Sequence, residues 1–144
     1  KEDIYETFMT GPEDSIEFYH GYTYSGHPLA AAAGLATLHV YEEEGLFARA
    51  KSLAPILEEE LQTIKGSPYV IDIRNYGLLG GVELEPIAGK PTTRAMSVFR
   101  QCFDNGLLVR TTGDTIALCP PLIASEDQVR TVVAKLKESL NSID

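Results

Sequence analysis

Two pairs of strand segments, each joined by a tight turn, constrain the fold of this 144-residue chain more than any other feature. The first pair meets near Gly77, and the second flanks Thr112-Gly-Asp114, which is a hairpin signal between apolar runs. The four segments span residues 69–76, 78–85, 107–111 and 115–119. Because tight turns join antiparallel strands, the pattern predicts a small, mainly antiparallel sheet.

In the first predicted strand, apolar and polar side chains alternate as they do in a half-buried strand. Tyr69, Ile71 and Ile73 share the apolar face in this pattern. Asp72 and Arg74 share the opposite face, and we expect them to form a structural ion pair rather than a substrate site.

Helical patterns surround these strands. The predicted helices cover residues 3–9, 28–43, 46–64, 93–104 and 126–143. Gly45 separates the second helix from the third as a left-handed cap, and Ser125-Glu-Asp-Gln128 forms a capping box before the last helix. Pro55 interrupts the third pattern, which predicts a kink or a restart with Ser52 as the cap.

The fourth helix begins after Thr92 or Thr93, either of which can cap it, and ends at Asn105-Gly106. Its inward side chains are predicted to be Ala95, Phe99, Cys102 and Phe103. The inward stripe of the last helix is predicted to be Val129, Val132, Val133, Leu136, Leu140 and Ile143. These stripes can cover one face of the sheet, so the predicted fold class is α+β, preceded by a loop and a linking helix.

Composition limits the kinds of partner. A hydrophobic content of 44% is enough to build a core, and a net charge of −9 argues against nucleic acid and anionic membrane surfaces. No apolar stretch is long enough to span a bilayer. Cys102 and Cys119 lie in apolar surroundings, which predicts buried, reduced thiols in a cytoplasmic protein. His20 and His39 show no metal-ligand spacing, so no metal site is predicted.

The run of residues 18–34 is the segment that most suggests chemistry. Residues 23–25 supply three hydroxyl groups, and Gly21 and Gly26 let backbone N–H groups approach a ligand closely. A helix follows from Pro28, so the loop suits an anion, such as a phosphate, beside a helix N-terminus. The alternative is an ordinary helix start with the proline at the first helical position.

Three segments, in this order, resemble the class III (fold type I) pyridoxal-phosphate aminotransferases. The first is Gly21-Tyr-Thr-Tyr-Ser-Gly-His-Pro-Leu-Ala30, followed by Gly34-Leu-Ala36. Residues 70–84 and 107–123 resemble the small-domain hairpin and the C-terminal hairpin of the family. Within the family, His27 favours the ω-amino acid or amine:pyruvate group, because other branches usually carry Asn there. The resemblance covers essentially the whole chain, but only the C-terminal part of such an enzyme.

The resemblance implies roles for three residues. Thr23, with the backbone of Tyr22, reaches the cofactor phosphate of the partner subunit, in a homodimer with a shared active site. Arg110 holds the carboxylate of the substrate or of pyruvate, and in amine-accepting members it can swing aside. From the residues alone, a carboxylate-binding role for Arg110 is matched equally by a structural one, as an exposed strand arginine or one paired with Asp114. The alternative for Thr23 is a turn threonine that bonds only its own backbone. His27 is expected to cap or orient the helix.

The resemblance also implies what the chain lacks. The family's Schiff-base lysine, its glycine-serine phosphate loop and the acidic partner of the pyridine nitrogen lie upstream of the matched part. No lysine of this chain stands in a comparable context, so no catalytic residue is assigned. We therefore expect a fragment that is inactive by itself. Residues 1–27 would be a remnant of the cofactor domain, 28–44 the interdomain helix, and 45–144 a small domain that still folds.

The expected function of the parent protein is transfer of an amino group from an ω-amino acid or amine to pyruvate through pyridoxal 5'-phosphate. Its partners are then two small molecules, the amino donor and pyruvate, and a second subunit. Two alternatives stay open. One is a non-catalytic α+β module for interaction or small-molecule binding, and the other is a related fold type I enzyme, such as a decarboxylase or a mutase.

Overall fold

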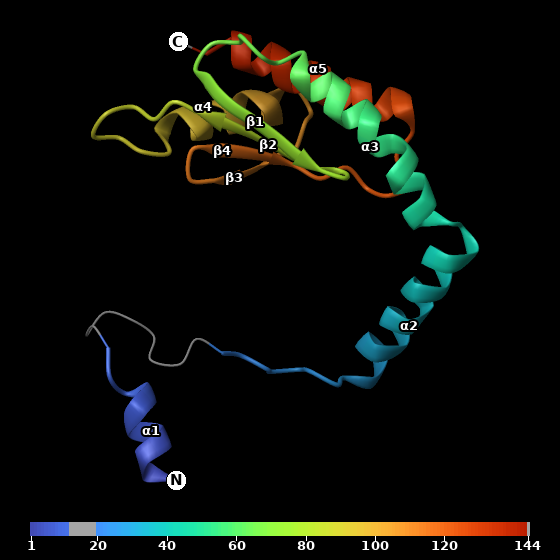
Figure 1. Ribbon diagram of the computed structural model, residues 1–144, viewed down its shortest axis with the longest axis vertical. Coiled ribbons are helices and arrows are strands. Elements are labelled where there is room, and N and C mark those ends of the chain that lie inside the picture. The colour runs from blue at the N-terminus through green and yellow to red at the C-terminus, as the bar shows by residue number, and fades with distance from the viewer. Residues whose placement is uncertain (12–19, 144) are drawn as a thin grey trace. The chain divides into compact units, whose positions relative to one another are not determined.

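The computed structural model describes residues 1–11 and 20–143 (Figure 1). They form two compact units, Lys1–Leu38 and His39–Asp144. The elements are α1 (Glu2–Phe8), α2 (Pro28–Glu43), α3 (Leu46–Gln62), β1 (Val70–Tyr76), β2 (Leu79–Leu84), α4 (Thr93–Asp104), β3 (Arg110–Thr112), β4 (Thr115–Leu118) and α5 (Glu126–Asn141). The beginning of the run that carries the predicted anion loop, residues 18 and 19, lies outside the described residues.

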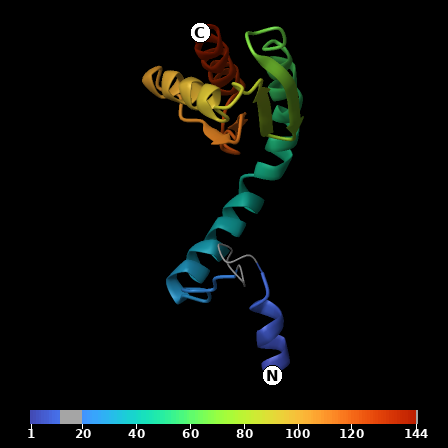
Figure 2. The same ribbon diagram turned by 90° about the vertical axis from the view of Figure 1, so that its left-hand side faces the viewer.

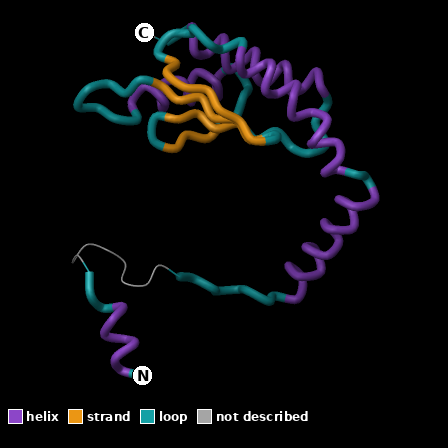
Figure 3. The backbone as a smooth tube through the Cα atoms, viewed as in Figure 1, coloured by secondary structure: helices purple, strands orange, loops and turns teal. Residues whose placement is uncertain are grey.

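The second unit is built on a four-stranded sheet with the order β1-β2-β4-β3. Every neighbouring pair is antiparallel, and the two hairpins join through β2 and β4 (Figure 3). Helices α3, α4 and α5 lie on one side of the sheet, and Figure 2 shows α4 and α5 side by side. None of the helices α3, α4 and α5 covers the opposite side of the sheet, which we call the open face. The predicted α+β fold, with helices on one face of an antiparallel sheet, is confirmed.

The hydrophobic core fills the space between the sheet and these three helices. Its fully buried side chains include Leu57 and Leu61 of α3, Val82 and Leu84 of β2, Ile116 of β4, and Leu136 and Leu140 of α5. Each such side chain contributes about 1.5–3 kcal/mol when it leaves water. All buried members of this cluster lie between Leu53 and Leu140, so the second unit supplies the core from its own residues.

A bulge changes the predicted pattern of β1. The pairing with β2 slips by one residue between Val70 and Asp72, which inserts Ile71 as an extra residue. Val70 and Ile73 pack against the core, whereas Ile71 is 57% exposed. The prediction that Tyr69, Ile71 and Ile73 share one apolar face is therefore wrong for Ile71, because strict alternation holds only where the ladder has no insertion.

Helix α3 runs through Pro55 without interruption, so the helix does not restart at Ser52. Pro55 lies on the exposed side, where water can reach the carbonyl that a proline leaves without an N–H partner. The Ser52 hydroxyl donates to the Arg49 carbonyl at 2.8 Å instead of capping a second helix. Gly45, with a φ of 61°, takes the predicted left-handed conformation between α2 and α3.

The start of α4 is held differently from the prediction. Thr92 occupies the N-cap position with a φ of 66°, in the left-handed region, and its side chain makes no capping hydrogen bond. Its backbone N–H instead donates to Asp114 Oδ1 at 2.9 Å. The predicted threonine cap is therefore absent, and a carboxylate from the β3–β4 turn binds the residue that precedes the helix to the sheet.

The buried face of α4 is partly as predicted. Ala95 and Cys102 are buried, and Phe99 packs against the core from a half-buried position. Phe103, predicted to point inward, is 62% exposed, and Val98 takes a core position instead. Positions 95, 98 and 102 define the buried stripe of the helix, and position 103 lies beyond its edge.

The last helix follows the sequence prediction. Ser125 Oγ accepts from the Gln128 N–H at 3.2 Å, and Gln128 Oε1 accepts from the Ser125 N–H at 2.9 Å, so the capping box is confirmed. The predicted stripe is also confirmed, with Val129, Val133, Leu136 and Leu140 buried and Val132 and Ile143 packed at its edges.

The two cysteines differ. Cys102 is buried, and this burial raises the pKa of its thiol, while a hydrogen bond with Ser139 lowers it by less. Cys119 is exposed, so the prediction of a buried thiol is wrong there. It follows Leu118, which points into the core, and the alternation of an extended chain turns the next side chain outward.

The first unit contains α1 and most of α2. Neither helix has a buried residue, and Leu29 and Leu35 of α2 are 76% and 62% exposed. Pro28 occupies the first position of α2, as predicted. Among the described residues, no helix is both long enough and apolar enough to cross a membrane.

Candidate functional site

The turn before α2 is tightly folded. Tyr24 and Gly26 have φ values of 68° and 76°, so both lie in the left-handed region. The Ser25 N–H donates to the Tyr22 carbonyl at 3.2 Å, and the His27 N–H donates to the Tyr24 carbonyl at 3.1 Å. A tyrosine in the left-handed region is unusual, and such residues concentrate at functional sites.

Thr23 has free donors in this turn. It is exposed, and within the described part of the chain neither its hydroxyl nor its backbone N–H has a hydrogen-bond partner. The alternative of a threonine bonded to its own backbone is therefore not what the structure shows. A free hydroxyl and a free N–H before a helix of 16 residues suit a phosphate dianion, so these residues fit the cofactor phosphate that the resemblance implies.

Two neighbours support the turn. The ring of Tyr22 is 75% exposed and stacks on His20, with 5.5 Å between centroids and 19° between planes. The His27 carbonyl accepts from the Ala31 N–H at 2.9 Å, so His27 begins the hydrogen bonding of α2. The orienting role of the His27 side chain stays a prediction.

Arg110 is the first residue of β3, an edge strand, and its side chain lies on the open face. The next residue, Thr111, donates its hydroxyl to Met96 Sδ of α4 at 3.7 Å and thus faces the helices. Since neighbours on a strand point to opposite faces, Arg110 faces away from the helices, and it is exposed. Within the described residues it forms no ion pair, with Asp114 or any other acid. Its guanidinium is therefore available to a carboxylate ligand.

The strand register places Arg110 in a row that crosses the whole sheet. Arg110 pairs with Ala117, Ala117 with Gly81, and Gly81 with Arg74. A Cβ at Gly81 would lie 3.6 Å from Arg74 Cγ, so the Arg74 side chain extends over that glycine on the same face. We call these four residues the arginine row: two small residues with an arginine at each end.

The two arginines of the row differ in their partners. Arg74 Nη1 donates to Asp72 Oδ2 at 2.5 Å, which confirms the predicted pair, and to Glu83 Oε2 at 2.7 Å. The hydrogen bond that Arg74 donates to Glu83, and then the one that it donates to Asp72, raise the pKa of Arg74 above its ordinary value. The charge of Arg74 is thus shared with two carboxylates, whereas that of Arg110 is not.

A hollow of about 330 Å³ lies beside the arginine row on the open face. Tyr76 and Leu79 form one wall, with exposed fractions of 88% and 55%. Gly81 and Ala117, which have little or no side chain, form its floor, and Arg74 also lines it. The volume lies in the range of small-molecule sites, and the lining is mostly apolar beside one charged residue.

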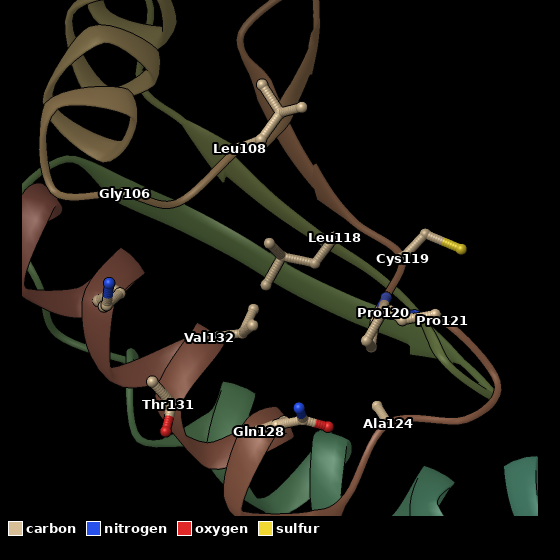
Figure 4. A pocket seen from close by; sticks show the side chains of 11 residues that line it. Gly106, Leu108, Leu118, Cys119, Pro120, Pro121, Ala124, Gln128, Thr131 and Val132 are labelled. Atoms are coloured by element: carbon tan, nitrogen blue, oxygen red, sulfur yellow. The ribbon is translucent and has the colours of Figure 1, made fainter.

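A second hollow, of about 410 Å³, lies between α5 and the end of β4 (Figure 4). Leu118 and Val132 point toward one another across it, and Cys119 stands at its rim with the sulfur directed outward. Lys135 is the charged residue of its lining, and Lys135 Nζ already donates to the Asn105 carbonyl at 2.8 Å. This hollow is therefore mainly an apolar surface, on the helical side of the sheet.

The described residues offer binding groups more than reactive ones. None of the lysines is buried: Lys1, Lys51, Lys65 and Lys90 are exposed, and Lys135 and Lys137 are half-buried. In the same part of the chain, no group of three or more His, Cys, Asp or Glu side chains could hold a metal ion.

The fold and these sites together define a class of protein. A turn with free donors at a helix start suits a phosphate, and a free arginine on the open face of an α+β domain suits a carboxylate. Both features are chemically suited to small anionic ligands. The profile of the family "Aminotransferase class-III" matches residues 1–140, and the chain belongs to this family.

Relatives with assigned activities resemble the chain over nearly its full length. It is 50% identical over 141 residues to the omega-aminotransferase of Caulobacter vibrioides. It is 40% identical over 143 residues to the beta-alanine–pyruvate aminotransferase of Pseudomonas aeruginosa. Each comparison covers 98% of this chain and 32% of the relative, so the chain spans about a third of the length of these relatives.

Solved structures show the same fold. A thermostable omega transaminase mutant from Pseudomonas jessenii matches with a TM-score of 0.77 and 34% identity, over 86% of this chain and 29% of that one. The omega transaminase from Pseudomonas jessenii in complex with PMP matches with a TM-score of 0.75 and 34% identity, over 85% of this chain and 28% of the other. The family resemblance and the fold expected from it are therefore confirmed.

Some residues of the open face were not singled out from the sequence. Glu83 joins the predicted Asp72–Arg74 pair, and Gly81 and Ala117 connect the two arginines. The alternation of the second predicted strand puts Glu83 and Gly81 on one face, and a register for the hairpin would have placed them opposite β1. Thr23 lies in the first unit and Arg110 in the second, so each site is defined within its own unit.

Proposed function

We propose that the chain is the C-terminal part of an aminotransferase that transfers an amino group from an ω-amino acid or an amine to pyruvate. The observation that carries this proposal is the exposed guanidinium of Arg110, unpaired among the described residues, on the open face of the small-domain sheet. Relatives named beta-alanine–pyruvate, omega-amino acid–pyruvate and putrescine–pyruvate aminotransferase support the donor class and the acceptor.

Arg110 binds the carboxylate of pyruvate, or of an ω-amino acid, in this proposal. A guanidinium can donate two parallel hydrogen bonds to one carboxylate, which fixes the position and the orientation of the small acid. The hollow beside the arginine row accommodates the part of the substrate that carries no charge. Amine donors without a carboxylate require the Arg110 side chain to swing aside, which an edge-strand position permits.

The proposed cofactor is pyridoxal 5'-phosphate, which supplies an electron sink and carries the amino group between the two substrates when it is bound. The Thr23 hydroxyl and the backbone at Tyr22 hold its phosphate, and in this proposal they do so in the neighbouring subunit of a homodimer. Support comes from the free donors of Thr23 and from the folded turn around it. The Ser25 N–H serves the turn itself rather than the ligand.

We further propose that this chain alone has no transaminase activity. None of its lysines is buried, and a lysine that binds the cofactor covalently needs a desolvated position to be an effective nucleophile. In this proposal residues 1–27 belong to the cofactor domain, 28–44 form the interdomain helix and 45–144 form the small domain. The buried thiol of Cys102 suits a reducing compartment, so we place the parent protein in the cytoplasm.

The test has two parts. The full-length protein that contains this chain is incubated with β-alanine and pyruvate, and alanine is measured; the proposal expects alanine to form only when pyridoxal phosphate is present. The chain alone is titrated with pyridoxal phosphate by visible absorbance, reduced with borohydride and mapped by mass spectrometry. The proposal expects no stoichiometric adduct.

Different results would separate the alternatives. A full-length protein that releases carbon dioxide from amino acids, with no amino transfer to pyruvate, would instead be a related fold type I enzyme. A full-length protein that binds the cofactor but converts no amine or amino acid would favour a non-catalytic module. One reduced lysine in the chain alone would contradict the proposal that the covalent lysine lies elsewhere.

A further inference from the structure

The arginine row contains a second guanidinium that the proposed function does not use. Arg74 and Arg110 stand at opposite ends of the row, on the same open face. Three strand spacings separate their Cα atoms, which is about 14 Å. Both side chains are long, so a small molecule lying over the middle of the row is within reach of both guanidinium groups.

The floor between the two arginines is open. Gly81 has no side chain and Ala117 has only a methyl group, and the hollow of about 330 Å³ extends along the row from Arg74 to Ala117. A molecule with a carboxylate at each end could lie on this floor with one carboxylate at Arg110 and the other at Arg74. By geometry alone, the open face is suited to dicarboxylates.

Two acids already engage the guanidinium of Arg74. Asp72 and Glu83 are directly opposite each other on β1 and β2, and both accept hydrogen bonds from Arg74 Nη1. Like charges in this position repel, and Arg74 offsets the repulsion by bridging them. The bulge at Ile71 creates the arrangement, because it shifts Asp72 by one residue into register with Glu83.

We propose that Asp72 and Glu83 are specificity-determining residues, which act by engaging Arg74. Because they occupy its guanidinium, the open face presents one free cation among the described residues, at Arg110, and selects substrates with one carboxylate over dicarboxylates. This inference rests on the proposed role of Arg110. It assigns a function to a charged cluster that would otherwise be only an exposed ion pair of small energetic value.

The test measures binding in the full-length, cofactor-loaded protein by isothermal titration calorimetry. The probes are glutarate and butyrate, which carry two carboxylates and one. In the Asp72→Asn/Glu83→Gln double variant, we expect the ratio of glutarate affinity to butyrate affinity to rise about tenfold, as one more charge-assisted pair provides. The single variants Asp72→Asn and Glu83→Gln disturb the sheet less, and each is expected to raise the ratio by a smaller factor. Adding Arg74→Ala to the double variant should return the ratio to that of the unmodified protein.

A matched control separates the local effect from net charge. The Glu58→Gln/Glu59→Gln variant removes the same two charges from the exposed side of α3, and its ratio should stay within about twofold of the original. An unchanged ratio in the Asp72 and Glu83 variants, single and double, would overturn the inference. So would an equal rise in the control variant, or a rise that persists without Arg74.

The same measurement distinguishes the two proposals. If Arg110→Ala weakens butyrate binding while the Asp72 and Glu83 variants leave the ratio unchanged, the proposed function stands and the inference fails. If Arg110→Ala leaves butyrate binding unchanged, the carboxylate role of Arg110 fails, and the inference that rests on it fails as well.

Discussion

The two units of the chain show different relations between sequence and structure. The second unit, His39–Asp144, has a buried hydrophobic core, a capped final helix and a sheet with a defined strand register. The first unit, Lys1–Leu38, has regular helices but no buried residue in either of them. A helix that is apolar around most of its circumference, as α2 is, obtains its stability from packing rather than from its own turns. The stability of this chain therefore resides in the second unit, while the first presents the turn with the free donors.

Core truncation should separate the units most strongly. Leu57→Ala, in the core of the second unit, is expected to lower the free energy of unfolding by about 2–5 kcal/mol, because it leaves a cavity among fully buried side chains. Leu35→Ala removes the same atoms from a side chain that is 62% exposed in the first unit, and should cost less than about 0.5 kcal/mol. Urea denaturation of the chain, followed by circular dichroism, measures both. Equal losses would show that the first unit shares the core.

Removing polar groups at the helix starts should also destabilise the second unit more than the first, but by smaller amounts. Ser125→Ala removes one half of the capping box of α5 and is expected to cost about 1 kcal/mol. Thr23→Ala, before α2, is expected to change the free energy of unfolding by less than about 0.5 kcal/mol, because Thr23 makes no hydrogen bond within the described residues. A stability loss at Thr23 as large as that at Ser125 would contradict the assignment of Thr23 to ligand binding.

An ion pair between two helices of the second unit should contribute still less. Arg130 of α5 pairs with Glu60 of α3 at the surface, and Arg130→Ala should cost at most about 1 kcal/mol. Because salt screens exposed charges, the difference between the variant and the original chain should shrink as sodium chloride is raised to about 1 M. A cost that does not depend on salt would indicate lost packing by the arginine stem rather than lost charge.

The thiol of Cys102 makes the stability of the second unit sensitive to alkaline pH. Burial raises its pKa in the folded state, whereas the unfolded thiol ionises at its ordinary value, about 8.5. The contribution of the neutral, buried thiol to the free energy of unfolding is therefore fully present below that pH. It is lost as the pH rises from there toward the raised pKa of the folded state. Denaturation midpoints from pH 7 to 10 should fall in the original chain and fall less in Cys102→Ala. Cys119→Ala, which removes the exposed cysteine, serves as the matched control.

Local patterns predicted most of the second unit. The hairpins, the capping box before α5 and the stripe on that helix all depend on neighbours within a few residues of one another, and all three were predicted from the sequence. Two of the errors arose where contact with a distant segment decided the outcome. At the start of α4, Asp114 accepts from the Thr92 N–H while the Thr92 side chain makes no capping hydrogen bond, and the bulge at Ile71 changed which residues of β1 face the core.

The residues of the candidate site also differ in whether the sequence could predict them. Arg110 and Thr23 were identified by their motifs, because each lies in a short segment with a recognisable pattern. The arginine row could not be identified in this way, since its four residues come from four strands and only the register brings them together. Alternation within one strand shows which side chains share a face, but not which side chains on other strands lie beside them.

The carboxylate role of Arg110 is the claim on which both functional proposals depend. Its most direct test is the kcat/KM for pyruvate in the full-length protein with Arg110→Ala, compared with Arg100→Ala, which removes an equally charged and exposed side chain from α4. The account predicts that Arg110→Ala lowers this value by roughly tenfold to a hundredfold, as loss of a charge-assisted pair requires, while Arg100→Ala leaves it within about twofold. Equal values for the two variants would contradict the account.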